Sequence, residues 1–483
     1  MTTPRDFPML IDGALVESES KTWLDVTDPA DESVIGRVPA GTSTDVNRAI
    51  AAAKAAWPAW AALDVRERAR QVRGVAQALR ARTDEILDIE VRDTGNTIAR
   101  ARADVAGAGD TLDFYAGLAT EMKGETVPAS ADNLHFTILE PYGVVARIIP
   151  FNHPIKFAAN ALAAPLIAGN CVVLKTPDTS PLSAGILAEI CQELLPAGVV
   201  SILSGQGNIV GDAIVRHCDI KRIGFTGSVP TGMAIQKAAA ESGVKAVTLE
   251  LGGKNPMIVF PDMVPAEIAK AAVAGMSFAW QGQSCGSMSR VFLHDDIHDE
   301  TLTEIVRIVS NLRLGSPREE ASQMGPVNSE AHYHRILRLI ETGRNEGARL
   351  LTGGKRPPGY DKGYWIEPTV FANVTPDMTI AREEIFGPVM SIIRWRDEAD
   401  VIRMANDSDL GLTASIWTRE YGAAMRMVRS IRSGYIWVNG ASRHFYGTPF
   451  GGFGNSGVGR EEGLSELLSY TETKTVHLMD FGQ

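Results

Sequence analysis

Between residues 144 and 253, short apolar runs alternate with single helix-like segments. The runs are rich in β-branched residues and lie at 144–150, 171–177, 199–205, 220–228 and 246–253. Strands joined by single helices form βαβ units, in which the strands lie parallel and the crossovers are right-handed. This alternation predicts an α/β fold built on a parallel sheet.

The segments on either side extend this architecture. Residues 44–121 carry apolar residues at helical spacing among alanines and charges, and a helix is expected to end at Gly95. From about residue 260, strands and helices alternate again, which predicts a second α/β domain. The glycine-rich stretch 446–463 is expected to form a loop, and residues 474–482 a strand with an exposed edge.

Composition narrows the class of protein. The chain has 483 residues, 45% of them apolar and 22% charged, with a net charge of −11, which indicates a globular protein of several domains. Because no dense run of Lys and Arg is present, we expect neither nucleic acid nor a membrane surface as a partner. The apolar stretch 144–174 is broken by polar residues, and residues 1–10 lack the apolar core of a signal peptide. These features predict a cytoplasmic protein.

One cysteine differs from the others in its sequence context. The four cysteines form no CxxC pair and no evident His/Cys cluster, so we expect no metal site and no disulfide framework. Cys171, Cys191 and Cys218 are expected to pack, whereas Cys285 lies among glycines and serines in GQSCGSMSR. Backbone N–H groups of such a loop can lower the pKa of a thiol and stabilise an oxyanion. Cys285 is therefore a candidate nucleophile, and a buried, inert cysteine is the alternative.

Two further residues have the chemistry that a cysteine nucleophile needs. Glu250 follows an apolar strand, where desolvation raises the pKa of a carboxyl group and suits it to act as a general base. Asn152 lies between prolines at the C-terminal end of the strand 144–150, where open α/β sheets bind ligands. Its carboxamide is a candidate oxyanion donor. A solvated acid and a turn asparagine are the alternatives.

Several strand ends carry weaker signals for a dinucleotide. Ser228 can cap the helix after the strand 220–228, and Gly205 and Gly211 lie at another strand–helix turn. Neither turn has the GxGxxG pattern. Lys175 and Asp178 could bind ribose hydroxyls, or could form only a surface ion pair.

Taken together, these segments resemble the NAD(P)-dependent aldehyde dehydrogenase superfamily. The similarity runs from about residue 8 to the end of the chain and rests on motifs in one order: PFNHP, LKTPD, FTGSVPTG, LELGGKNP, GQSCGSMSR, EEIFGPV and PFGGFGNSGVGRE. The resemblance implies a small-molecule aldehyde substrate and a homodimer or homotetramer. It also implies a Rossmann-like cofactor domain, an α/β catalytic domain and a small β oligomerisation element. Their respective ranges are 1–118 with 142–252, 253–466, and 119–141 with 467–483.

The resemblance also implies a mechanism and a cofactor. Cys285 attacks the aldehyde to form a thiohemiacetal and then a thioester, Asn152 stabilises the oxyanion, and Glu250 activates the hydrolytic water. Because an acid at Asp178 would repel a 2′-phosphate, NAD is expected in preference to NADP. The implied cofactor-binding residues are Ile148, Pro150, Phe151, Lys175, Asp178, Gly205, Gly211, Thr226, Gly227, Ser228, Leu251, Glu384 and Phe386.

The motif PFNHP departs from the family pattern, because Phe151 stands where Trp is usual and His153 replaces a common aromatic residue. We expect a polar substrate tunnel and an aromatic or polar aldehyde. The expected lining residues are His153, Phe157, Asn160, Ser284, Arg443, His444 and Phe450.

Other functions fit parts of this pattern. In a CoA-acylating dehydrogenase, CoA would replace water, but Glu250 argues for hydrolysis. A cofactor-independent cysteine esterase or amidase would need a histidine base beside Cys285, and the motif supplies none. A non-catalytic binding protein would not need Cys285, Glu250 and Asn152 together.

Overall fold

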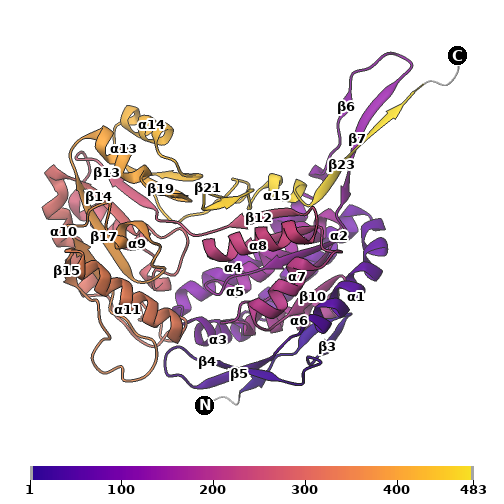
Figure 1. Ribbon diagram of the computed structural model, residues 1–483, viewed down its shortest axis with the longest axis horizontal. Helices are drawn as coiled ribbons and strands as arrows, with labels where there is room; N and C mark the ends of the chain where they lie inside the picture. Colours follow the sequence, from indigo (N-terminus) through magenta and orange to yellow (C-terminus); the bar gives the residue numbers. More distant parts are fainter. Residues whose placement is uncertain (1–3, 480–483) are drawn as a thin grey trace.

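The chain folds into two α/β units, each built around one sheet, and a projecting β arm (Figure 1). The structure is a computed structural model that describes residues 4–479. An eight-stranded sheet forms the centre of one unit, and a seven-stranded sheet forms the centre of the other. The predicted α/β class is therefore confirmed.

The first sheet contains the predicted parallel strands. They are β8 (Val144–Ile148), β9 (Cys171–Lys175), β10 (Val200–Leu203), β11 (Arg222–Thr226) and β12 (Ala246–Glu250). All residues of β8, β9, β10 and β11 are buried, as expected for central strands covered on both faces. The spatial order is β22-β12-β11-β8-β9-β10-β2-β3. Antiparallel edge strands flank the parallel ones, namely β2 (Met9–Ile11), β3 (Ala14–Val16) and β22 (Gly457–Val458).

The strand order fixes where a ligand can bind. The chain passes from β8 to β9 on one side, and after β10 it returns to place β11 on the other side of β8. The carboxyl ends of β8 and β11 therefore open onto a crevice at this reversal, which is the usual ligand site of an open α/β sheet. The connecting helices are α5 (Pro154–Ala168), α6 (Leu182–Leu194), α7 (Asp212–Arg216), preceded by a π-turn at Gly207–Gly211, and α8 (Val229–Ser242).

The expected helices before the sheet are present. Thr42 and Asp45 form a capping box at the start of the first helix, and Gly95 ends the third in a left-handed conformation. The helices are α1 (Ser43–Ala62), α2 (Val65–Ala81), α3 (Thr83–Thr94) and α4 (Ile98–Gly117), followed by η1 (Ala119–Glu121).

The second sheet has the order β15-β16-β17-β14-β13-β19-β20 and is parallel apart from β15. Its strands are β13 (Pro256–Val259), β14 (Arg290–His294), β15 (Arg349–Thr352), β16 (Thr369–Ala372), β17 (Val389–Trp395), β19 (Thr413–Trp417) and β20 (Tyr435–Val438). The associated helices are α9 (Pro265–Gly275), η3 (Phe278–Trp280), α10 (Asp295–Ser310), α11 (Glu330–Asn345), α12 (Thr379–Arg382), α13 (Glu398–Asn406) and α14 (Tyr421–Ser430).

Two three-stranded sheets and one short strand pair complete the fold. An antiparallel arm extends from the body and pairs β6 (Thr126–Val127), β7 (Leu134–Pro141) and β23 (Thr471–Leu478), and β23 follows α15 (Leu464–Leu468). The predicted strand at 474–482 is thus present as far as Leu478, and residues 480–482 lie outside the described chain. A three-stranded sheet joins β1 (Arg5–Asp6), β4 (Trp23–Thr27) and β5 (Val34–Pro39).

The expectation that residues 446–463 form a loop is wrong in part. β21 (Phe453–Gly454) pairs with β18 (Leu410–Gly411), and β22 pairs with β12 at Glu250. Short glycine strands give little local signal, because their pairing depends on the two sheets that they bridge.

Over residues 4–479, none of the helices combines the length and the apolar character needed to cross a membrane.

Candidate active site

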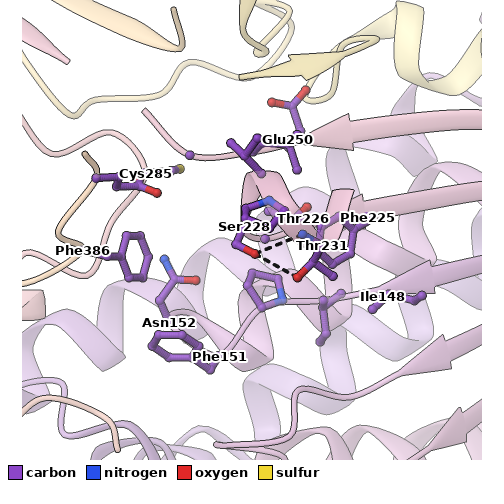
Figure 2. Close-up of a pocket in the computed structure, with 18 of the residues that line it drawn as sticks. Ile148, Phe151, Asn152, Phe225, Thr226, Ser228, Thr231, Glu250, Cys285 and Phe386 are labelled. Atoms are coloured by element: carbon purple, nitrogen blue, oxygen red, sulfur yellow. Dashed lines mark hydrogen bonds between the residues drawn. The ribbon is translucent and has the colours of Figure 1, made fainter. Parts of the chain in front are cut away.

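One large cavity lies at the carboxyl ends of β8 and β11, between the two sheets. Its volume is about 1370 Å³, and Asn152, Glu250 and Cys285 all line it. Figure 2 shows Cys285 on the side of the second sheet and Asn152, Ser228 and Glu250 on the side of the first. The three predicted catalytic residues are therefore brought to one site, although they are spread over more than 130 positions of sequence.

The segment before Cys285 has a strained backbone, and its packing against Gly387 explains the strain. Gln281 and Gly282 both have positive φ. A Cβ at position 282 would lie 2.2 Å from the carbonyl oxygen of Gly387, so glycine is required there. Asn255 holds the next turn by donating its amide to the carbonyl oxygen of Cys285 at 2.6 Å. The loop is thus a fixed platform for the thiol.

The protonation state of Cys285 differs from the expectation. Burial raises the pKa of its thiol to about 12, and the negative charges of Glu384 and Glu250 act in the same direction. The positive charge of Lys156 opposes them. The predicted lowering of the pKa by loop amides is therefore wrong for this structure, because burial and carboxylates distant in sequence outweigh nearby dipoles.

Asn152 is buried and positioned from two sides. Its amide donates to the carbonyl oxygen of Gln283 at 3.0 Å, which leaves one amide hydrogen uncommitted. The backbone carbonyl oxygen of Asn152 accepts a hydrogen bond from the side chain of Asn96, and the Glu90 carboxylate accepts one from the backbone of Ile155. Residues at the end of α3 thus clamp the turn that carries Asn152 over the cysteine loop.

Glu250 ends β12 and is buried. Neither of its carboxyl oxygens has a hydrogen-bond partner among the described residues. Burial raises its pKa well above the ordinary value, as expected, and the charge of Glu461 adds to the effect. Its Oε1 lies 2.7 Å from where a Cβ at Gly451 would stand, so only glycine leaves room for the carboxyl group.

The segment beside Glu250 is anchored by a buried ion pair. Arg147 of β8 contacts Glu461 at 2.7 Å and the hydroxyl of Tyr470 at 2.8 Å. Glu466 lies 3.9 Å from the same guanidinium group. Because the buried charges of Arg147 and Glu461 neutralise each other, the ion pair fixes the glycine-rich segment 446–463 against strand β8 of the first sheet.

The start of α8 forms one wall of the cavity. Ser228 caps this helix by accepting from the backbone of Thr231, as predicted, and the first turn contains no acidic residue. The Thr226 hydroxyl is buried and has no partner among the described residues. Helix N-terminal amides and a free hydroxyl together suit an anionic group such as a pyrophosphate.

Lys175 and Asp178 lie farther along the same cavity. The ammonium group of Lys175 is hydrogen-bonded to Asp178, which also accepts from the backbone of Gly207 at 3.0 Å. Gly211 lines the cavity, whereas Gly205 does not: a Cβ there would meet Gly41 at 2.8 Å. Gly205 is therefore required by backbone packing and does not contact the cavity.

Glu384 and Phe386 reach the cavity from the second sheet. The Glu384 carboxylate accepts from the backbone of Gly253 at 3.0 Å, and burial raises its pKa to about 7. Nε2 of His332 donates to the backbone carbonyl oxygen of Phe386 at 2.6 Å, so this nitrogen carries the proton. Arg335 donates to the backbone carbonyls of Glu384 and Ile385.

The ring of Phe151 packs edge-on against Phe386, with centroids 5.8 Å apart. This agrees with the expected position of Phe151 in the cofactor part of the cavity. All the predicted cofactor-binding residues except Gly205 line the cavity.

The opposite end of the cavity is aromatic and polar. His153 bonds to Asp104 at 2.8 Å and packs edge-on against Trp280. Phe157 and Asn160 extend the same face of α5, and the amide oxygen of Asn160 is buried without a partner among the described residues. Ser284, His444 and Phe450 complete this end as predicted.

Arg443 is not part of the lining. Its guanidinium group stacks on Phe445 at 5.1 Å and is exposed.

Sequence reasoning missed several lining residues with charged or ionisable side chains, among them Lys156, His332, Arg335 and Glu462. Lys156 had a usable signal, because it follows His153 by three positions and precedes Asn160 by four, which is the spacing of one helix face. Glu462 pairs with His444 at 2.8 Å, which requires the fold. His332 and Arg335 lie on α11, and their role depends on its contact with the segment at Phe386.

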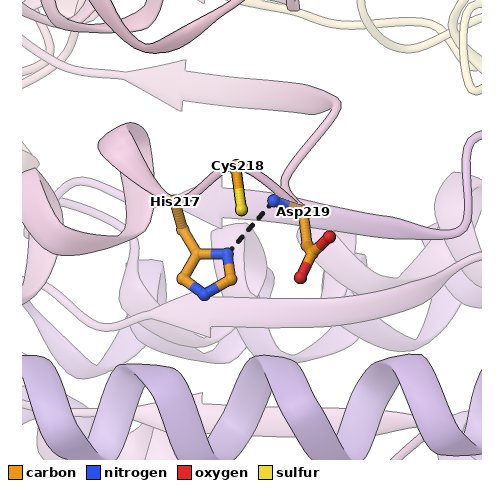
Figure 3. Close-up of side chains that lie close together, drawn as sticks. All are labelled: His217, Cys218 and Asp219. Carbon is orange, nitrogen blue, oxygen red and sulfur yellow. Dashed lines mark hydrogen bonds between the residues drawn. The ribbon is translucent and has the colours of Figure 1, made fainter.

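A group of potential metal ligands lies outside this cavity. The donor atoms of His217, Cys218 and Asp219 lie within 4.8 Å of one another (Figure 3). Two of the three groups are already engaged: His217 accepts from the backbone of Asp219 at 3.2 Å, and Asp219 pairs with Lys54 at 2.9 Å. A structural zinc site needs four ligands, and the neighbouring ammonium group would repel a cation. That the chain holds no metal stays a prediction.

Comparison with known proteins places this geometry in a family. Residues 15–476 match the model of the aldehyde dehydrogenase family. The chain is 41% identical to aldehyde dehydrogenase tropH of Talaromyces stipitatus, over 98% of this chain and 94% of the relative. An NAD+ complex of aldehyde dehydrogenase from Bacillus cereus matches with a TM-score of 0.95 and 36% identity, covering 98% of this chain and 96% of the other. A complex of a 3,6-anhydro-L-galactose dehydrogenase with NADP matches with a TM-score of 0.95 and 32% identity, covering 98% and 100%.

Proposed function

The chain belongs to the aldehyde dehydrogenase family of NAD(P)-dependent enzymes, and we propose that it oxidises an aldehyde to the carboxylic acid through covalent intermediates on Cys285. The observation that carries this proposal is the single cavity that Cys285, Asn152 and Glu250 share. The reaction needs one site for a cofactor and one for an aldehyde. The cavity offers anion-binding groups at one end and aromatic groups at the other.

The residues present fit a nicotinamide dinucleotide. The unpartnered Thr226 hydroxyl and the acid-free start of α8 suit the pyrophosphate. Asp178 and Lys175 suit the hydroxyls of the adenosine ribose, and Glu384 those of the nicotinamide ribose. A nicotinamide held there supplies the hydride acceptor for the oxidation.

Cys285 is the proposed nucleophile. Its thiolate attacks the aldehyde carbon and forms a thiohemiacetal, and loss of hydride from that carbon leaves a thioester on the sulfur. The thiol proton must leave before attack, because burial favours the protonated form.

Two donors are available for the oxyanion. The uncommitted amide hydrogen of Asn152 is one, and the backbone N–H of Cys285 is the other, because no hydrogen bond of that N–H occurs among residues 4–479. Each such donor contributes about 3 kcal/mol of transition-state stabilisation.

Glu250 is the proposed base for thioester hydrolysis. Its buried carboxyl group has no competing hydrogen bond among the described residues, and its raised pKa matches the task of taking a proton from water. The presence of this base supports water over CoA as the acyl acceptor. A histidine-activated esterase is less well supported, since no histidine in residues 4–479 is hydrogen-bonded to Cys285.

We also propose a preference for NAD over NADP and a polar or aromatic aldehyde substrate. The carboxylate of Asp178 would repel a 2′-phosphate, and His153, Phe157 and Asn160 offer rings and polar groups to the substrate. A higher kcat/KM with NADP than with NAD would contradict the proposed cofactor preference. Faster turnover of plain medium-chain alkanals than of polar or aromatic aldehydes would contradict the proposed substrate class.

The arrangement of sheets supports the proposed domains: a cofactor domain of 1–118 and 142–252, a catalytic domain of 253–466, and a β arm of 119–141 and 467–483. Because β6 and β23 leave the two edges of the arm sheet unpaired, and the arm exposes apolar residues such as Leu134, Ile138 and Leu478, we propose that it pairs with a second copy in a dimer or tetramer. Sedimentation of an arm-deleted chain would test this.

The central experiment is a panel of aldehydes assayed by NADH formation. The wild-type chain and Cys285→Ala are compared, with Cys218→Ala as the matched control because Cys218 is exposed and outside the cavity. We expect only Cys285→Ala to abolish activity. Substantial turnover by that variant would refute the proposed nucleophile.

A further inference from the structure

The aldehyde end of the cavity contains a lysine that neither the proposed chemistry nor the fold requires. Lys156 lies on the first turn of α5, on the face that also carries His153 and Asn160, and it lines the cavity. Its side chain is half-buried. Burial raises the pKa of Tyr446, and the positive charge of Lys156 opposes this effect. Against the effect of burial, the hydrogen bond to His444 and then the charge of Lys156 lower the pKa of Glu462. Lys156 is therefore within electrostatic reach of Tyr446, Glu462 and the Cys285 thiol.

Two carboxylates near the aldehyde end of the cavity already have partners of their own. Asp104 accepts from His153 at 2.8 Å, and Glu462 pairs with His444 at 2.8 Å. Lys156 has neither an ion pair nor a hydrogen bond among residues 4–479. A half-buried ammonium group that faces a cavity is stabilised when an anion completes its coordination.

The side chain of Lys156 packs beside α4. A Cβ at Gly107 of this helix would lie 3.8 Å from both the Lys156 Cε and the Tyr446 hydroxyl, an ordinary van der Waals contact, so both side chains lie against the helix. Arg100 of the same helix stacks on Trp280 at 4.8 Å and adds positive charge.

We propose that the substrate is an aldehyde that carries a carboxylate, which Lys156 binds while Cys285 attacks the aldehyde carbon. The rings of His153, Phe157 and Phe450 then pack on a flat carbon skeleton between the two groups. This inference rests on the proposed function and narrows its substrate class.

Two aldehydes of the same shape test the inference. Terephthalaldehydic acid carries the carboxylate, and its primary amide replaces that group with a neutral one of equal size. We expect the wild-type chain to favour the acid by about ten-fold or more in kcat/KM, mainly through KM, as for a hydrogen bond to a charged group. In Lys156→Met this ratio should fall towards one, and Lys156→Arg should retain most of it.

The exposed Lys270 of α9 provides a matched control, because it lies outside the cavity lining and Lys270→Met removes the same charge. An equal ratio in the wild type, or a ratio that survives in Lys156→Met, would overturn the inference. So would a loss in Lys156→Met that is equal for acid and amide, since Lys156 would then serve the thiol. In each of these cases the amide is still oxidised by wild type, so the proposed function stands. If the wild type oxidises neither compound nor any other aldehyde, the proposed function fails.

Discussion

The ionisation of Cys285 can be tested directly. The structure places its pKa at about 12 because of burial and the charges of Glu384 and Glu250. An ordinary thiol of pKa 9.0 is about one-tenth ionised at pH 8, whereas this one is ionised to about one part in ten thousand. The thiolate is also intrinsically more nucleophilic, which returns a factor of roughly 30. Alkylation at pH 8 should therefore be about 30-fold slower than for an ordinary thiol of equal access.

The assay is the rate of iodoacetamide labelling of the free enzyme against pH. It requires a Cys218→Ser background, because Cys218 is exposed, while Cys171 and Cys191 are buried with pKa values raised to about 12. We expect the rate to rise about ten-fold per pH unit up to about pH 10 without a plateau. Glu384→Gln should accelerate labelling several-fold.

The neighbouring Glu383 supplies the matched control, because it is exposed and is not among the charges that raise the Cys285 pKa. A labelling midpoint at or below pH 9 would refute the reasoning. Equal rates in Glu384→Gln and Glu383→Gln would show that burial alone sets the pKa.

Three other predictions concern groups around the thiol. Glu250→Gln should lower kcat by about 10²- to 10⁴-fold while keeping a burst of NADH, measured by stopped flow, because acylation precedes the step that needs the base; loss of the burst would contradict this order. Asn152→Ala should lower kcat by about 10²- to 10³-fold with little change in KM, since it removes an oxyanion donor, and a purely KM effect would exclude that role. Burial raises the pKa of Glu90 to about 8, so the folded chain holds a proton that the unfolded chain loses above about pH 4.5, and stability should fall as pH rises through this window. In Glu90→Gln the fall between about pH 5 and pH 8, measured by urea unfolding, should shrink by about 3 kcal/mol, and an unchanged slope would contradict the shift.

The parts of the fold that were predictable have local signals. The strands β8 to β11 are buried on both faces, so their apolar runs stand out in the sequence, and the Ser228 cap follows from its place before a helix. By contrast, α11 went unpredicted although Tyr333, Ile336 and Ile340 have helical spacing, and it carries the His332 and Arg335 contacts.

The parts that could not be predicted depend on residues distant in sequence. The clamp on Asn152 comes from Glu90 and Asn96, more than 50 positions earlier, through hydrogen bonds that exist only after α3 and α5 pack. The predicted direction of the Cys285 pKa shift was wrong for the same reason. Chain neighbours indicate loop dipoles, but Glu384 lies 99 positions later and its charge reaches the thiol only in the folded chain.

The carboxylates around the thiol also make sense of the order of the proposed steps. The charge of Glu250 raises the pKa of Cys285, so a thiolate forms most easily while Glu250 is protonated. Attack on the aldehyde needs the thiolate, and at that stage a charged base has no task. Once the sulfur has become a neutral thioester, it no longer opposes a negative charge on Glu250, and water activation needs that charge. The two groups repel each other's ionised forms, yet the reaction requires those forms at different stages, so one buried cavity can contain both.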